Sequence, residues 1–107
     1  MQVTVFDGER FSKSSATEAL ELARTTYGTF WIDIQADGTE DPQAIALVEA
    51  LGVDAEAAME ALRSRLDLSF IVSPQGVRGA AWVDDGDGTR ASQVRFNWNA
   101  ERLVTIR

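Results

Sequence analysis

The stretch TFWIDI, residues 29–34, decides the fold, because its apolar residues alternate more clearly than those of any other segment. In an extended chain Phe30, Ile32 and Ile34 share one face, and Trp31 and Asp33 share the other. The pattern predicts a strand with one face in a core. An acid within an apolar strand is uncommon. Asp33 is either a catalytic or ligand carboxylate, or an acid that hydrogen-bonds nearby backbone or caps a helix; the second interpretation is favoured.

Helices are predicted on both sides of this strand. Before it, Ser15 and Glu18 have the spacing of a capping box, and Gly28 follows the last apolar position. After it, Asp41 is a helix cap and Pro42 takes the first helical position, where a missing N–H costs nothing. The expected buried stripes are Ala16, Ala19, Leu20, Ala23 and Tyr27 in the first helix, and Ala44, Leu47, Val48 and Leu51 in the second.

A third helix is predicted to begin after Asp54. Glu56, Glu60 and Arg63 fall on its wet side. Two acids four residues apart on one helix face are able to share a cation. More often such carboxylates are hydrated or pair with a basic side chain three residues further along the helix. The sequence alone favours this second interpretation. The expected apolar stripe is Ala55, Ala58, Met59, Leu62 and Leu66.

The second half of the chain has an apolar period of two, which predicts an antiparallel meander of four strands. They cover residues 66–72, 77–84, 94–98 and 102–106. A further strand, Gln2 to Phe6, begins the chain. The expected order is β-α-β-α-α-β-β-β-β, an α+β domain with a mixed, largely antiparallel sheet and about three helices covering one face.

Composition excludes several classes of function. The 107 residues suffice for one domain, and no apolar run has the length of a membrane span or the form of a signal peptide. The chain has no cysteine and no histidine, which excludes zinc or copper sites built on sulfur or imidazole, and Ser-His-Asp or Cys-His catalysis. The net charge of −7 argues against binding of nucleic acid and against direct contact with an anionic membrane. We expect a cytoplasmic domain that binds or regulates, and not an enzyme.

The densest group of acids is Asp84-Asp85-Gly86-Asp87-Gly88. It is similar to a calcium loop, but the EF-hand pattern requires Gly at its sixth position and Glu at its twelfth. Counted from Asp85, these positions hold Arg90 and Phe96. A hairpin turn that uses Asp and Gly for left-handed backbone is therefore favoured.

The three tryptophans are a further candidate for binding. Trp31, Trp82 and Trp98 all fall in predicted strands. They are either platforms on which a ligand stacks or packing partners within the sheet, and packing is favoured.

Five segments follow one another in a recognisable order. Residues 30–34 place Trp and Asp in a strand, residues 46–53 end a helix with Leu-Gly-Val, and residues 59–62 read Met-Glu-Ala-Leu. Residues 68–72 form a later strand, and residues 93–96 with 102–107 form a closing hairpin that ends in Leu-Val-Thr-Ile followed by a base. Together they resemble the cytosolic N-terminal domain of the CorA family of magnesium and divalent-cation transporters. The chain departs from the family in lacking its His-Pro and Arg-Pro-Lys segments, its stalk, its membrane helices and its Gly-Met-Asn motif.

The resemblance implies a single soluble domain at residues 1–107, without stalk and transmembrane parts. In a full-length transporter such a domain belongs to a homopentamer at the cytosolic face of the membrane. There, a carboxylate at the place of Glu60 helps hold a regulatory divalent ion against a neighbouring stalk, and release of the ion favours opening. Glu56 is a second candidate ligand. The isolated domain is expected to be a monomer or weak dimer that binds Mg²⁺, Co²⁺ or Zn²⁺ weakly.

Two other functions stay open at this point. One is a stand-alone protein-interaction module that has the same fold and no transport activity. The other is an acidic enzyme that uses Asp33 with a second carboxylate, although no partner with convincing spacing is present.

Overall fold

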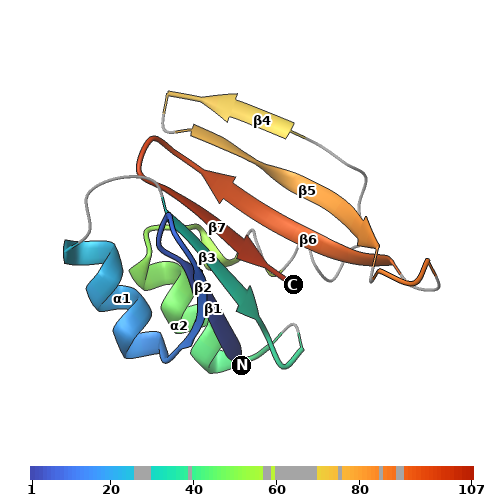
Figure 1. The fold of residues 1–107 in the computed structure, drawn as a ribbon. Coiled ribbons are helices and arrows are strands. Elements are labelled where there is room, and N and C mark those ends of the chain that lie inside the picture. Colours follow the sequence, from blue (N-terminus) through green and yellow to red (C-terminus); the bar gives the residue numbers. More distant parts are fainter. Residues whose placement is uncertain are drawn as a thin grey trace.

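The computed structural model describes residues 1–25, 30–38, 40–56, 59, 70–74, 76–84, 86–88 and 91–107. Within these residues the chain has an α+β fold with two helices and one seven-stranded sheet (Figure 1). The elements in chain order are β1 (Gln2–Phe6), β2 (Phe11–Ser14), α1 (Ala16–Thr25), β3 (Phe30–Gln35), α2 (Pro42–Ala50), β4 (Phe70–Ser73), β5 (Gly76–Asp84), β6 (Ala91–Trp98) and β7 (Arg102–Ile106).

The sheet is mixed, as predicted, with the strand order β2-β1-β3-β7-β6-β5-β4. All neighbours pair antiparallel except β3 and β7, which are parallel. Parallel strands need a crossover connection, and here α2 and the hairpins of β4, β5 and β6 lie between the two strands along the chain. The central strand pair therefore joins segments more than seventy residues apart in register, such as Asp33 and Thr105.

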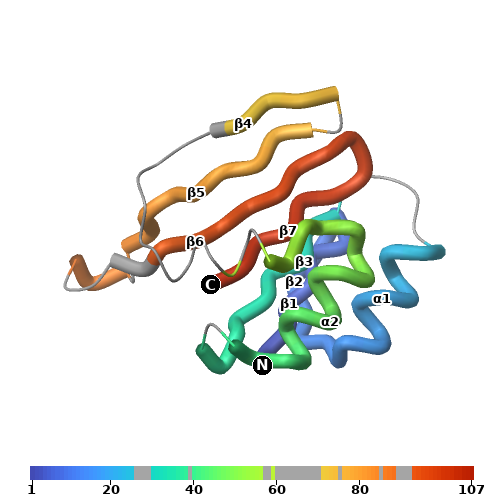
Figure 2. The backbone as a smooth tube through the Cα atoms, turned by 180° about the vertical axis from the view of Figure 1, so that it is seen from behind, coloured from blue at the N-terminus to red at the C-terminus, as the bar shows by residue number. Residues whose placement is uncertain are grey.

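Both helices lie on one face of the sheet, over the half made by β1, β3 and β7 (Figure 1 and Figure 2). β4 and β5 extend beyond them (Figure 2). The predicted alternation of β3 is confirmed, because Phe30, Ile32 and Ile34 are buried against the helices while Trp31 and Asp33 face the other side. The core consists of Val3, Val5, Ala19, Phe30, Ile32, Ile34, Ala44, Leu47, Val48, Leu51, Ala55, Met59, Val104 and Ile106.

The predicted caps of both helices are confirmed. The hydroxyl of Ser15 accepts from the N–H of Glu18 at 3.1 Å, and the Glu18 carboxylate accepts from the N–H of Ser15 at 2.8 Å, which is a capping box. At α2 the Asp41 carboxylate accepts from the amides of Gln43 at 3.0 Å and Ala44 at 3.3 Å, next to Pro42 in the first helical position. Local hydrogen bonds thus explain where each helix begins.

The third predicted helix falls largely outside the described residues. Of its positions, Ala55, Glu56 and Met59 are helical, with Ala55 and Met59 buried and Glu56 exposed, as the stripe predicts. The two helices with full bounds are α1 and α2, so the expected number of about three is confirmed only in part. Gly28, the expected end of α1, and residues 66–69, the expected start of β4, also lie outside the described residues.

The strand β2 is absent from the predicted order. Its sequence, Phe-Ser-Lys-Ser, has one apolar residue, and its first three side chains are exposed. It pairs with β1 on one side and forms an edge of the sheet. Such a strand has no apolar alternation because it buries no face, and a lysine at the edge is a common protection against pairing with other chains.

The cap of α2 also links the stability of the fold to pH. The pKa of Asp41 lies below its usual value of about 3.9, mainly because its carboxylate accepts the N–H of Asp37 at 2.9 Å and, further, the amides at the start of α2. A lowered pKa in the folded state means that ionised Asp41 stabilises the fold above the unfolded value. This stabilisation is lost as the pH falls from about 4 through the folded pKa.

We expect the change Asp41→Ala to lower the melting temperature at pH 7 by about 4–8 °C, because the cap of α2 and the contact with Asp37 are lost. Asp41→Asn keeps an acceptor but no charge, so its melting temperature should fall less than that of the wild type between pH 5 and 3. Thermal melts followed by circular dichroism measure both effects. The exposed neighbour Glu40 supplies the control, Glu40→Gln; equal acid sensitivity in wild type and Asp41→Asn would contradict the role of the charge.

Candidate functional site

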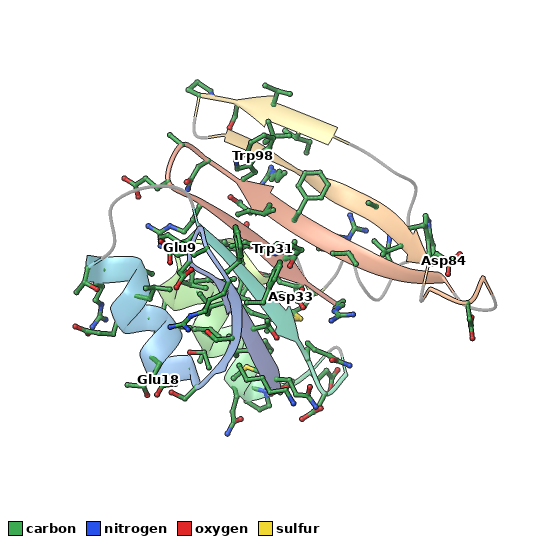
Figure 3. All side chains as sticks on the ribbon, viewed as in Figure 1. Glu9, Glu18, Trp31, Asp33, Asp84 and Trp98 are labelled. Carbon is green, nitrogen blue, oxygen red and sulfur yellow. The ribbon has the colours of Figure 1, made fainter. Side chains whose placement is uncertain are left out.

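The described acids do not converge on one place. No group of three or more acidic side chains with the geometry of a metal site occurs among the described residues. Figure 3 shows Glu18 at the start of α1, Asp33 in the centre of the sheet and Asp84 at the far end of β5. Within this part of the chain, a complete carboxylate site for a cation is therefore not formed.

The acidic loop after β5 has the geometry of a turn. Asp84 Oδ1 accepts from the N–H of Gly86 at 2.8 Å and of Gly88 at 3.0 Å. Gly86 and Gly88 have positive φ values of 95° and 75°, which glycine adopts without strain. The prediction of a hairpin turn is confirmed for these residues, because the Asp84 carboxylate is used to hold the loop. Asp85 lies outside the described residues.

The candidate metal ligands of the third helix are seen only in part. Glu56 is exposed at the start of the helical segment that contains the buried Ala55. Glu60 lies outside the described residues, so its position relative to Glu56 stays a prediction.

Asp33 is part of a chain of side-chain hydrogen bonds between β3 and β7. The Trp31 indole N–H donates to the Thr105 hydroxyl at 2.8 Å, and this hydroxyl donates to Asp33 Oδ1 at 2.6 Å. The other oxygen of Asp33 accepts from the Arg107 guanidinium at 3.1 Å. Thr105 is buried and the Asp33 side chain is only 17% exposed. The four groups form one network across the parallel strand pair.

This network changes the interpretation of Asp33. The favoured expectation, a bond to nearby backbone or a helix cap, differs from what is found, because its partners are the side chains of Thr105 and Arg107. Both were present in the sequence, but only the parallel register of β3 and β7 places them beside Asp33. The carboxylate is neutralised by Arg107 and has a structural role, since it satisfies a buried hydroxyl that in turn satisfies an indole N–H.

The three tryptophans have different surroundings. Trp31 meets the Phe11 ring edge-on, with 5.5 Å between centroids, so packing is confirmed for this residue. Trp98 is 55% exposed and Trp82 is 46% exposed. From the pairing register, Trp98 lies on the face of the sheet opposite the helices, whereas Trp82 lies on the helix side. The exposed indoles therefore do not form a common platform.

An apolar row crosses the whole sheet on the face opposite the helices. Each of its members is the register partner of the next, and each strand contributes one side chain. The row contains no charged or polar side chain. In the order of the strands it consists of Phe11, Phe6, Trp31, Leu103, Trp98, Val77 and Val72, which we call the apolar row.

The apolar row is the site that sequence reasoning missed. Alternation already placed Phe6 and Trp31 on the face opposite the core of their own strands. It does not say which strands are neighbours or which residues are paired, and Phe11 belongs to a strand that was not predicted. The strand order and the register together bring these residues into one line.

Comparison of the sequence with models of known protein families gives no match, and a search of curated proteins gives none either. No helix among the described residues is both long and apolar enough to cross a membrane. The function must therefore be argued from the residues and their arrangement.

The network predicts a clear effect of removing one hydroxyl. Thr105→Val keeps the shape of the side chain but leaves the Trp31 N–H and one Asp33 oxygen without their partner, which should lower the free energy of unfolding by about 1–3 kcal/mol. Thr105→Ser keeps the hydroxyl, so its free energy of unfolding should fall by less. Urea denaturation measures the difference, and the indole N–H resonance of Trp31 should shift in the valine variant only. Equal stability of the two variants would show that the network contributes nothing.

Proposed function

We propose that this chain is the cytosolic regulatory domain of a CorA-like transporter of Mg²⁺ or another divalent cation, with no catalytic activity of its own. The observation that carries the proposal is the position of two of the segments that resemble the family, residues 30–34 and 102–107. They are far apart in sequence and are adjacent parallel strands at the centre of the sheet. Their distinctive residues, Trp31, Asp33, Thr105 and the basic Arg107, form a single hydrogen-bond network.

The charge of the domain supports a regulatory role for a cation. Copies with a net charge of −7 repel one another when brought together, and a bound divalent ion offsets this repulsion. Carboxylate oxygens are the ligands that Mg²⁺ prefers. In the proposed mechanism Glu60, with Glu56 four residues before it in the sequence, supplies half of a site that a neighbouring subunit completes. Loss of the ion loosens the interface and shifts the population toward the open state.

In this proposal the domain works in the cytoplasm, at the cytosolic face of the membrane, as one of five subunits. On its own it lacks the contacts that a stalk and membrane helices supply. The isolated domain is then a monomer or weak dimer, because a stable assembly needs a larger contact area than one such domain offers to its neighbour.

A second candidate function is a stand-alone protein-interaction module. The observation in its favour is the apolar row, of which three members are exposed, since exposed apolar side chains gathered on one face are typical of a surface that binds protein. The two candidates differ in what they need beyond this chain: the module works alone, whereas the regulatory domain requires a transporter.

The reading frame that follows the Arg107 codon distinguishes these candidates. For the transporter we expect a long charged helix, two apolar spans and a Gly-Met-Asn motif. A stop codon, or an unrelated domain, at that place would contradict the transporter and favour the module.

Calorimetric titration with Mg²⁺ tests the half-site. We expect the isolated domain to bind Mg²⁺ with a dissociation constant above about 1 mM, because one or two carboxylates in water leave the ion largely hydrated. Glu60→Ala and Glu56→Ala should weaken even this binding, whereas Glu21→Ala, which removes an exposed acid of α1, should not. Submillimolar affinity that Glu60→Ala abolishes would mean a complete site within this chain, and the half-site proposal would be wrong.

A further inference from the structure

The apolar row is exposed at both ends and near its middle. Phe11 at one end is 60% exposed, Val72 at the other end is 77% exposed, and Trp98 is 55% exposed. Seven strands at a spacing of about 4.8 Å make the row about 29 Å long. Contact of large apolar side chains with water raises the free energy of the isolated domain. Removal of this contact is the main source of free energy for association.

The face that contains the apolar row is nearly free of charge. Among its positions in the described strands, Lys13 and Asp33 are the charged residues, and Asp33 is paired with Arg107 at 3.1 Å. Described acids such as Glu18, Glu49 and Glu56 lie instead in helical segments, away from the strands. Two copies of this acidic domain therefore approach each other with the least repulsion through this face.

The sizes of the side chains along the apolar row change from one end to the other. Phe11, Phe6 and Trp31 occupy one half, Leu103 the centre, and Trp98, Val77 and Val72 the other half, so the two halves differ in size at their outer two positions. A two-fold axis along β7 would reverse the row of the second copy. Each large end then lies over a small end, Phe11 over Val72 and Phe6 over Val77, while Leu103 lies over itself. The alternative axis, along the row, would place Phe11 against Phe11 and Val72 against Val72, and the large aromatic pair would keep the small valine pair from close contact.

We propose that the apolar row is the interface of a homodimer, in which two sheets pack face to face about a two-fold axis along β7, with Phe11 of one copy over Val72 of the other. Twisted sheets pack in this aligned way at about −30°, and an interface with one patch on both subunits is the commonest symmetric one. The strands at the two ends of the row, β2 and β4, have four residues each, which is about 13 Å. A strip about 29 Å by 13 Å buries about 380 Å² on each copy, which is the size of a weak, transient interface.

This inference does not rest on the proposed regulatory function. It concerns the face opposite the helices, whereas Glu56 and Glu60 belong to the segment after α2, and Ala55 and Met59 of that segment are buried in the core on the helix side. Submillimolar binding of Mg²⁺ within this chain, or an unrelated reading frame after Arg107, would contradict the proposed function and leave the dimer unaffected, and a monomeric protein would leave the cation proposal unaffected.

Sedimentation equilibrium of the full chain tests whether the face that contains the apolar row forms a dimer. We expect dimerisation with a dissociation constant of about 10–100 µM. The variants Trp98→Ser and Trp82→Ser form a matched pair, because both remove an exposed indole from the β5–β6 hairpin, one on each face of the sheet. Trp98→Ser should weaken the dimer at least about tenfold. Trp82→Ser should leave it unchanged, and circular dichroism confirms that both variants are folded.

Cross-linking tests the alignment, and the absence of cysteine from the chain provides a clean background. We expect a short bismaleimide to link Phe11→Cys with Val72→Cys when the two variants are mixed. Leu103→Cys should link to itself, whereas Phe11→Cys alone should not.

Three results would overturn the proposal. They are a wild type that stays monomeric up to millimolar concentration, a dimer that Trp82→Ser weakens and Trp98→Ser does not, and efficient linking of Phe11→Cys to itself. The first result would mean that a different partner covers the apolar row, and the last would mean that the axis lies along it.

Discussion

The parallel pairing of β3 with β7 is the interaction on which the rest of the structure depends. It joins the N-terminal half, which contains both helices, to the meander of β4, β5, β6 and β7. On the helix side Ile32 and Ile34 lie beside Val104 and Ile106, all of them buried in one core. On the other side the same strands are held by the bonds among Trp31, Thr105, Asp33 and Arg107. Without this strand pair the meander would not be joined to the rest of the sheet, and α1 and α2 would pack against a sheet that lacks β7.

The strand pair also gives the sheet two unlike faces. On one face β-branched side chains and Phe30 pack against α1 and α2 and are buried in the core. The other face has a polar network at its centre and, next to it, a line of aromatic and aliphatic side chains that passes through every strand. One face of the sheet is therefore buried in the core, and the other keeps part of its apolar side chains in contact with solvent.

Charge separates the two surfaces further. The domain has a net charge of −7, and the acids among the described residues lie in large part on helices and loops, where they meet water or serve as caps, as Glu18 and Asp41 do. The proposed cation half-site belongs to this acidic surface, and the proposed dimer interface belongs to the uncharged one. The two surfaces respond to different conditions. Salt and divalent ions change the repulsion between acidic surfaces, whereas association through the apolar row is driven by burial of apolar area.

The sequence by itself determined the local structure. Ser15 with Glu18 and Asp41 with Pro42 set the starts of the helices, and the alternation of Phe30, Ile32 and Ile34 set the buried face of β3, because these signals act over a few residues. The tertiary structure decided what depends on contacts between distant segments. It made an edge strand of residues 11–14, which have no apolar period of their own, and it gave Asp33 its partners Thr105 and Arg107. It also aligned seven side chains into one apolar row. No turn joins β3 directly to β7, so their register is set by the match of their buried faces in the folded sheet and cannot be read from either segment alone.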